Sequence, residues 1–242
     1  MFSNFKIFVL SFLIISIQSL NFSLLCQEEP NGKKLNGGMG YFMPGVSILN
    51  IKDLNSTLAS KNYPKFSSSL TSFGGGGHAI ISNFIIGGEG HGMFAKEQTT
   101  DKVSLNLGAG YGVFNLGYVL FSSGGLMVYP LVGFGGSGIS LSLTERYIPK
   151  FEQVLDSLKG HVELSTGGFL LHFAIGADFL ITFDNSEKAH GGVMVGLRAG
   201  FLYSPIAGDW KMDDVKVSGG PEIGLTGAYI RLLIGGGGFG KK

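Results

Sequence analysis

The chain has 242 residues, of which 44% are hydrophobic and only 14% are charged, and its formal net charge is +1. An average soluble domain carries about 25% charged residues, and a chain this close to neutral gives no support for a nucleic-acid partner. Glycine accounts for 41 residues, yet the chain lacks the G-X-Y period of collagen. Because the glycines lie inside apolar segments, the composition favours a folded domain over a disordered tail.

Residues 1–26 are predicted to be a secretory signal peptide. Lys6 precedes an apolar run at 7–17, and a more polar segment follows at 18–26. The apolar run is too short to span a membrane as a mature helix. No later stretch offers about 20 apolar residues without interruption by glycine or polar residues.

Cys26 is the only cysteine of the chain, so no intrachain disulfide can form. It is either discarded with the signal or becomes the acylated first residue of a lipoprotein, although Leu25 stands where such a site needs a small residue. Residues 27–35 are polar and are expected to be a flexible lead-in. A single domain is predicted over 36–242.

After the lead-in, the pattern predicts a series of apolar strands joined by polar turns. Alternation with a period of two is typical of a strand whose two faces have different environments. A helical spacing of apolar residues at 50–63, with Asn50 as N-cap, predicts a short helix after the first strand. A second helix is expected within 144–160, and a loop containing Trp210 at 204–220. The predicted strands cover 37–48, 73–81, 84–95, 103–113, 116–121, 126–143, 169–183, 193–203 and 223–239.

Two turns and one proline refine this prediction. Ser82-Asn83 separates two apolar runs and predicts a tight hairpin. Ser122 to Gly125 predicts another turn. Pro130 lies inside a long strand and predicts a bulge or bend there, because proline cannot donate to a ladder. Together the segments predict an all-β fold, an antiparallel up-and-down β-barrel of about 8–10 strands with short loop helices.

Periodicity cannot decide which face of such a sheet meets solvent. A soluble barrel buries its apolar face, whereas a membrane barrel turns that face to lipid. The face opposite the apolar one is rich in glycine, alanine, serine and asparagine. Crowding inside a small barrel explains such a face better than exposure to water does. Aromatic residues at strand ends would form interfacial girdles: Phe73, Phe84, Phe94, Phe114, Phe121, Phe169, Phe183, Tyr203 and Phe239.

The non-apolar face carries a few charged and imidazole groups. Burial would require such groups to pair with one another. We therefore predict a polar network in the barrel interior, formed by Glu89, His91, His172, Asp178 and Arg198. The alternative interpretation is a metal or acid–base site formed by His78, Glu89, His91, His172 and Asp178, although no dense ligand motif is present. No cofactor is predicted.

The glycine-rich phrases FGGGGHAIISNFIIGGEGHG and GLTGAYIRLLIGGGG, with the export signal, resemble small outer-membrane β-barrel proteins of bacteria. The resemblance covers most of 36–239 and implies a fold but no activity. Taking the resemblance together with the small-residue face, we predict a non-enzymatic outer-membrane barrel with a filled, glycine-lined lumen and a structural or surface-interaction role. Its partners would be membrane lipid and an extracellular or periplasmic partner at the loops 50–70, 144–165 and 204–220.

Two alternatives stay open at this point. One is a secreted or periplasmic soluble barrel that binds an apolar ligand against its Phe/Leu/Ile face. The other is a lipid-acting membrane-barrel enzyme that uses His91 or His172. The chain contains no G-x-S-x-G motif.

Overall fold

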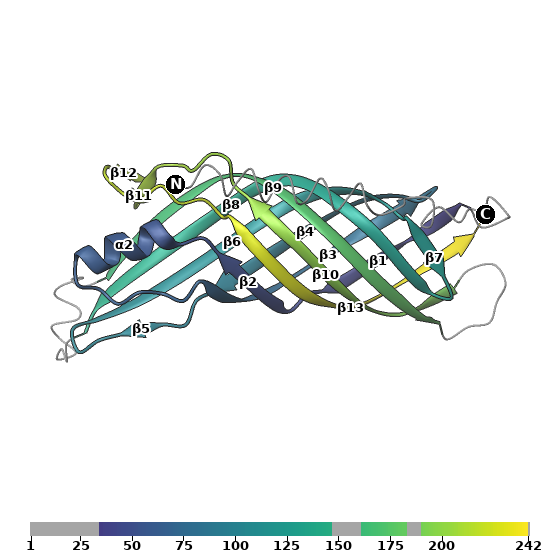
Figure 1. Cartoon of the computed structure of the whole chain (residues 1–242), viewed down its shortest axis with the longest axis horizontal. Coiled ribbons are helices and arrows are strands. Elements are labelled where there is room, and N and C mark those ends of the chain that lie inside the picture. Colours follow the sequence, from purple (N-terminus) through teal and green to yellow (C-terminus); the bar gives the residue numbers. More distant parts are fainter. Residues whose placement is uncertain (1–33, 147–160, 183–189, 242) are drawn as a thin grey trace, which may run out of the picture. The chain divides into compact units, whose positions relative to one another are not determined.

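The computed structural model describes residues 34–146, 161–182 and 190–241, so the signal peptide and the helix expected after residue 146 lie outside the described residues. The described chain is almost entirely β, with one short helix (Figure 1). The elements are β1 (Leu35–Phe42), β2 (Gly45–Leu49), α2 (Lys52–Ser60), β3 (Ser69–Ile81), β4 (Phe84–Phe94), β5 (Gln98–Thr99), β6 (Val103–Tyr118), β7 (Phe121–Ser123), β8 (Leu126–Glu145), β9 (His161–Thr182), β10 (His190–Tyr203), β11 (Trp210–Met212), β12 (Val215–Val217) and β13 (Gly227–Lys241).

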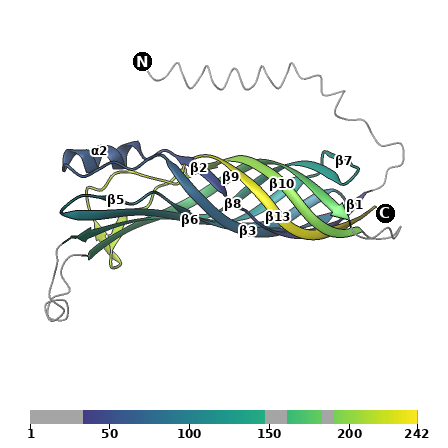
Figure 2. The same ribbon diagram turned by 90° about the horizontal axis from the view of Figure 1, so that it is seen from below.

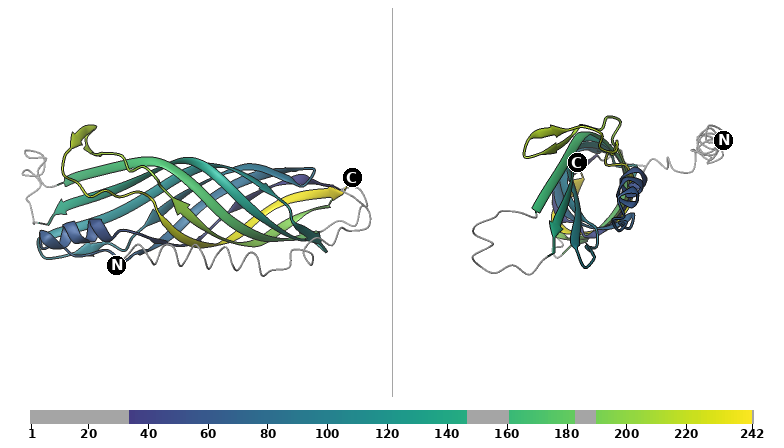
Figure 3. Two further views of the ribbon diagram at one scale, coloured as in Figure 1. Left: turned by 45° about the horizontal axis from the view of Figure 1, so that its top comes forward. Right: turned by 90° about the vertical axis from the view of Figure 1, so that its left-hand side faces the viewer.

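The strands close into a ring, which the end-on view of Figure 3 shows. Going round it, β1, β3, β4, β6, β8, β9, β10 and β13 pair with their neighbours, and β13 pairs back to β1. Strand β2 continues β1 along the same two partners. All these pairings are antiparallel, so the predicted up-and-down barrel is confirmed, with eight strand positions.

The register also gives the stagger of the barrel. We start at Gly37 and follow the paired residues once around the ring. The path returns to the β1–β2 position at Ser47, which is ten residues further along the chain. The shear of the barrel, which is this displacement, is therefore 10. A shear of ten in eight strands implies a tilt of about 40° and a rise along the barrel axis of about 2.5 Å per residue. An eight-stranded barrel of this kind has an interior that its own side chains can fill.

The two ends of the barrel differ. At one end β3 turns into β4 over Ser82 and Asn83, whose φ angles of 52° and 71° give the primed turn that suits hairpins. The first residues of β1 pair with the last residues of β13 at this same end. At the other end, long connections carry α2 and the β11–β12 hairpin, and β8 and β9 extend beyond the shorter strands (Figure 2). The barrel is therefore asymmetric, with short turns and strand termini opposite long loops.

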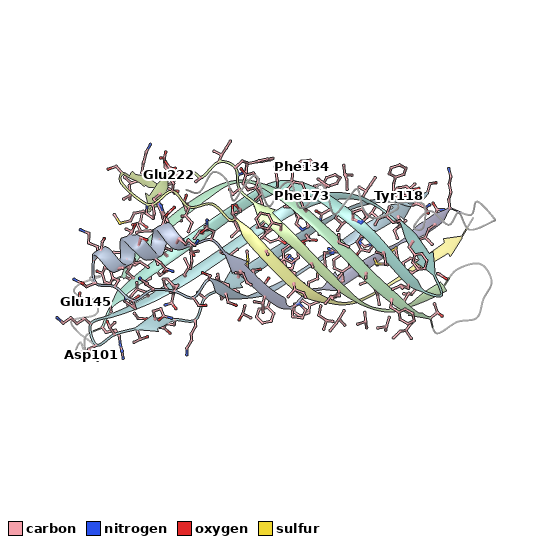
Figure 4. The ribbon with its side chains drawn as sticks, viewed as in Figure 1. Asp101, Tyr118, Phe134, Glu145, Phe173 and Glu222 are labelled. Carbon is pink, nitrogen blue, oxygen red and sulfur yellow. The ribbon has the colours of Figure 1, made fainter. Side chains whose placement is uncertain are left out.

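The outer wall carries an apolar belt, which is complete on β9 and is interrupted by outward glycines on β3 and β4. On β9 the outward positions are apolar from Phe169 to Ile181, and then change to exposed polar and glycine residues towards His161. Twelve residues at the tilt above span about 30 Å along the axis. Figure 4 shows Phe134, Phe173 and Tyr118 projecting from the strands, and the charged residues that it labels at the long-loop end. The outward aromatic residues include Phe73, Phe84, Phe94, Phe114, Phe121, Phe169 and Tyr203, as expected for the girdles.

Two details of this outer wall differ from the prediction. Phe239 turns inward and is half-buried. The prediction for Phe183 is not tested, since this residue lies outside the described residues. The glycines do not gather on one face: Gly110 and Gly112 of β6 face outward, whereas Tyr111 and Val113 are buried inside. Inward glycines are also numerous, so the prediction of a glycine-lined lumen describes only part of the glycines. Over 103–113 of β6 the apolar face is the interior one, whereas Phe114, Leu116 and Tyr118 of the same strand face outward.

Two local predictions are wrong. Asn50 is not the N-cap of the helix, since Ile51 occupies that position without a side-chain cap hydrogen bond. Pro130 causes no bulge, because the register between β8 and β9 runs through it without interruption. Pairing of β8 with β6 starts only at Leu131, after its pairing with β7 ends at Val128. The proline therefore stands between two partners, where a missing N–H is tolerated.

The described residues include no helix with the length and apolar character needed to cross a bilayer.

Candidate functional site: a polar layer inside the barrel

The five residues predicted for the interior network all lie inside the barrel and are buried. They come from three different strands: Glu89 and His91 from β4, His172 and Asp178 from β9, and Arg198 from β10. Each stands at an inward position of its strand, where successive side chains alternate between the two faces. The outward neighbours of Glu89 and His91 are glycines, and those of the other three residues are apolar. Arg198 and Asp178 are 0% exposed, so the protein itself must supply their counter-charges.

Glu89 is the centre of the layer. Its Oε2 lies 2.6 Å from Nη1 of Arg198, and its Oε1 lies 3.4 Å from Nη1 of Arg231 on β13. Tyr111 donates a hydrogen bond to Oε1 at 2.9 Å, and the Asn115 amide donates to Oε2 at 3.1 Å. Two guanidinium groups and two neutral donors therefore surround one carboxylate, which is the condition for keeping a charge in a barrel interior.

Asp178 forms the second anionic point of the layer. Tyr129 donates a hydrogen bond to its Oδ2 at 2.5 Å, and Nη2 of Arg198 donates to the same phenol oxygen at 2.8 Å. Arg198 thus connects both carboxylates, one directly and one through a tyrosine. Two carboxylates and two guanidinium groups balance, so the layer has no net charge apart from its histidines.

The histidines line the same layer. His172 contacts the Asn115 side chain at 2.8 Å through Nδ1 and the Tyr229 hydroxyl at 2.5 Å through Nε2. His78 contacts the Tyr41 hydroxyl at 3.2 Å. His91 stacks on Tyr111 but makes no hydrogen bond within the described residues. These ring contacts fill the space between the charged groups.

Sequence reasoning missed half of this layer. The missed residues are Arg231, Asn115 and the tyrosines 41, 111, 129 and 229. Arg231 had a usable signal, because it is the one charged residue between Gly227 and Gly240. Tyrosine gave no such signal, since an apolar face also accepts it and only the fold shows where its hydroxyl points.

Some of the inward glycines have a packing reason. A Cβ on Gly176 would lie 2.5 Å from Cζ of Tyr129, and one on Gly76 would lie 2.8 Å from Cβ of Glu89. Both are closer than real Cβ contacts, so a larger residue at either position would displace the polar layer. In these positions crowding explains the glycine, as expected for a narrow barrel.

Apolar side chains seal the polar layer on both sides. Towards the short-turn end lie the buried residues Ile80, Ile85, Leu180 and Met194, which form two cross-strand pairs, Ile80 with Ile85 and Leu180 with Met194. Towards the long-loop end lie the buried residues Leu70, Met93, Leu170 and Leu202. The interior is therefore a packed core with a polar middle.

The chemistry available to this layer is limited by its burial. No group of three or more His, Cys, Asp and Glu side chains is arranged to hold a metal ion in the described ranges. His91 and His172 have no hydrogen bond to a serine hydroxyl among the described residues, and their side chains are buried. The arrangement suits a structural network better than the acid–base site considered from the sequence.

The long-loop end holds the other candidate contacts. A cleft of about 450 Å³ lies between the end of α2 and the turn after β5, and is lined by Lys61, Asn62, Tyr63, Thr100, Asp101, Lys102 and Val103. The β11–β12 hairpin lies beside β9. Trp210 of this hairpin is buried and donates from Nε1 to the carbonyl of Pro221 at 2.8 Å. It is thus a packing anchor for this loop.

Comparison with known proteins adds structural likeness only. No protein-family model matches the chain, and no curated protein matches it either. Among solved structures, Ail, the attachment invasion locus protein of Yersinia pestis, is 12% identical with a TM-score of 0.38, over 86% of this chain and 97% of that one, both alone and with the heparin analogue sucrose octasulfate. The outer membrane protease OmpT from Escherichia coli is 9% identical with a TM-score of 0.22, over 87% of this chain and 96% of that one.

These likenesses give no family assignment. These TM-scores are below 0.5, and the description of the barrel rests on its own strand pairing.

Proposed function

We propose that this protein is a non-enzymatic β-barrel of a bacterial outer membrane that holds its long loops at the cell surface. The observation that carries the proposal is the outward apolar belt, about 30 Å tall on β9, on a closed ring of strands. Transmembrane barrels carry such a band, about 25 Å tall, with aromatic girdles at both interfaces and polar groups inside. A water-exposed wall bearing Phe173, Ile175 and Phe179 would be an extreme case of exposed apolar surface.

The outward direction of the aromatic residues weighs against the alternative of a soluble barrel that binds an apolar ligand. That alternative requires the Phe/Leu/Ile face to line an internal cavity, but Phe169 and Phe173 are 45% and 43% exposed. The interior positions of the same strand hold His172 and Asp178 instead. Within the described residues, the Phe/Leu/Ile face of β9 therefore does not line the interior, which weighs against the soluble ligand-binding barrel.

A filled interior argues for an anchoring role over transport. Arg198, Tyr129 and Glu89 occupy the middle of the lumen, with apolar layers on either side. The parts of the chain free to vary without disturbing this core are the long connections at one end. We place these outside the cell, since such barrels have short periplasmic turns and longer extracellular loops. Their cleft and the β11–β12 hairpin are the proposed contacts for an extracellular partner.

Cell fractionation combined with a gel run with and without boiling tests the membrane assignment. We expect recovery in the outer membrane and a shift in mobility on heating. Recovery of the wild type as a soluble monomer without detergent would overturn the proposal.

A pair of variants on β9 locates the belt. Phe173→Lys places a charge in the belt and should reduce membrane assembly, at a cost of about 2–4 kcal/mol near the bilayer midplane. Ser165→Lys on the same strand, eight residues closer to the long-loop end, lies beyond the belt and should assemble normally. Equal assembly of the two variants would contradict the position of the belt.

A further inference from the structure

On one side of the barrel, four buried polar residues have side-chain atoms with no hydrogen-bond partner among the described residues. They are the hydroxyls of Ser47 and Ser72, both ring nitrogens of His91, and Nε and Nη2 of Arg231. Ser47 and Ser72 are 0% exposed, Arg231 is 1% and His91 is 5% exposed. Buried polar groups are almost always satisfied by protein or by ordered water, so these atoms call for a bound partner.

The strand register brings the four residues together. Ser47 on β2 pairs with Leu70 of β3, and Ser72 stands two residues further along that strand, so the two serines are diagonal neighbours on the inner face. Ser72 pairs with Met93, which places His91 of β4 diagonally beside it. Diagonal neighbours in a sheet lie about 7–8 Å apart at Cα, a separation that a single water molecule can bridge between side chains.

Arg231 completes the group from the other side of β2. It pairs with Gly45, and a Cβ on Gly45 would lie 2.7 Å from Cγ of Arg231, so the arginine side chain passes directly over that glycine. Gly45 in turn pairs with Ser72. The four residues therefore occupy adjacent inner positions on β13, β2, β3 and β4.

We infer that this wall of the barrel binds a cluster of ordered water molecules, coordinated by Ser47, Ser72, His91 and Arg231. A buried water molecule commonly makes about three hydrogen bonds to otherwise unsatisfied groups. The group offers donors from the guanidinium, hydroxyls that donate or accept, and an imidazole. His91 Nε2 lies 3.7 Å from Oε1 of Glu89, which is too long for a direct hydrogen bond.

The balanced charges of the polar layer favour a neutral water molecule over an ion at this position. Arg231 is already paired with Glu89, and Arg198 and Asp178 complete a balanced set in the same layer. An added anion would meet the carboxylate of Glu89, and an added cation would meet the guanidinium of Arg231. A neutral molecule that both donates and accepts adds no charge.

The sealing layers make the water long-lived. Leu70 and Met93, which are 1% and 0% exposed, pair with Ser47 and Ser72 and flank the group on the inner face. Exchange with bulk solvent therefore requires an opening of the packed barrel, and residence times should far exceed those of surface water.

Magnetic relaxation dispersion of water, measured on the folded full-length mature protein in detergent micelles, counts such long-lived molecules. We expect Ser47→Ala with Ser72→Ala to lower the long-lived water component by at least one molecule relative to wild type. Ser68→Ala, an exposed serine beside β3, is the matched control and should leave that component unchanged. Heat-modifiable mobility confirms that each variant is folded before the comparison.

If the double serine variant does not fold, His91→Phe replaces it, since this change removes both ring nitrogens and keeps an aromatic side chain. A folded variant of either kind with the same long-lived water component as wild type would overturn the inference. Membrane assembly is measured separately and does not enter this comparison, so a failure of the proposed function leaves the test of the water cluster intact.

Discussion

Glu89→Gln is the most informative single change in this protein, because it removes one charge from the centre of the interior layer and preserves the shape of the side chain. Glu89 lies 2.6 Å from Arg198 and 3.4 Å from Arg231, and all three side chains are buried. After the substitution, two guanidinium groups share the lumen with the single carboxylate of Asp178. We expect the folded barrel to lose substantial stability.

The magnitude follows from the burial of the pair. Removing one partner of a buried ion pair costs about 3–5 kcal/mol, because the remaining charge is left uncompensated. A double variant, Glu89→Gln with Arg198→Met, restores the balance, with Asp178 and Arg231 remaining. We therefore expect the double variant to lose less stability than the sum of the two single changes, with a coupling energy of about 2 kcal/mol or more.

Denaturant unfolding of the protein refolded in phospholipid vesicles measures these differences, with the heat-modifiable gel shift as the readout of folding. Glu163→Gln on β9 is the matched control, since it makes the same chemical change at an exposed residue of the long-loop end. Its effect should stay within about 0.5 kcal/mol. A loss below about 1 kcal/mol for Glu89→Gln, or additive effects in the double variant, would refute the reasoning that the ion pairs hold the interior together.

Three further outcomes are expected. Gly176→Ala should lose about 1–3 kcal/mol of unfolding free energy by vesicle unfolding, because its Cβ would overlap the Tyr129 ring; Gly112→Ala, whose Cβ meets nothing within 4 Å, is the control, and an equal loss would contradict the packing argument. Asn83→Ala should cost about 2 kcal/mol in the same assay, since Asn83 has a positive φ and its Oδ1 accepts a hydrogen bond from a β1 amide at 2.8 Å; no loss would show that the turn does not need it. Trp210, the only tryptophan, should emit at short wavelength and resist iodide quenching while folded; a water-like emission would contradict its burial.

Much of the fold could be read from the chain. Alternation with a period of two specifies strands locally, since each residue turns its side chain to the face opposite its neighbour. The strands of 73–81 and 84–95 and the turn between them follow from that pattern, and so does the helix that begins near residue 52. The lone charged residues in apolar strands marked the interior positions of Glu89 and Arg198.

What the pattern could not decide was the direction of the faces and the pairing partners. The apolar face of β9 turns outward and that of β6 turns inward at Tyr111 and Val113, although both alternate in the same way. Only closure of the ring, with a stagger of ten residues, sets which residues meet across the lumen. Arg231 and Glu89 are 142 residues apart in the chain, and no local rule relates them.

The sequence by itself therefore determined the strands, the hairpin turn and the presence of a few inward charges. The tertiary structure decided the neighbours of those charges, the roles of the tyrosines and the two faces of the glycines. The physical reason is that alternation is a property of one strand, whereas charge pairing and packing depend on strands brought together by the closure of the barrel.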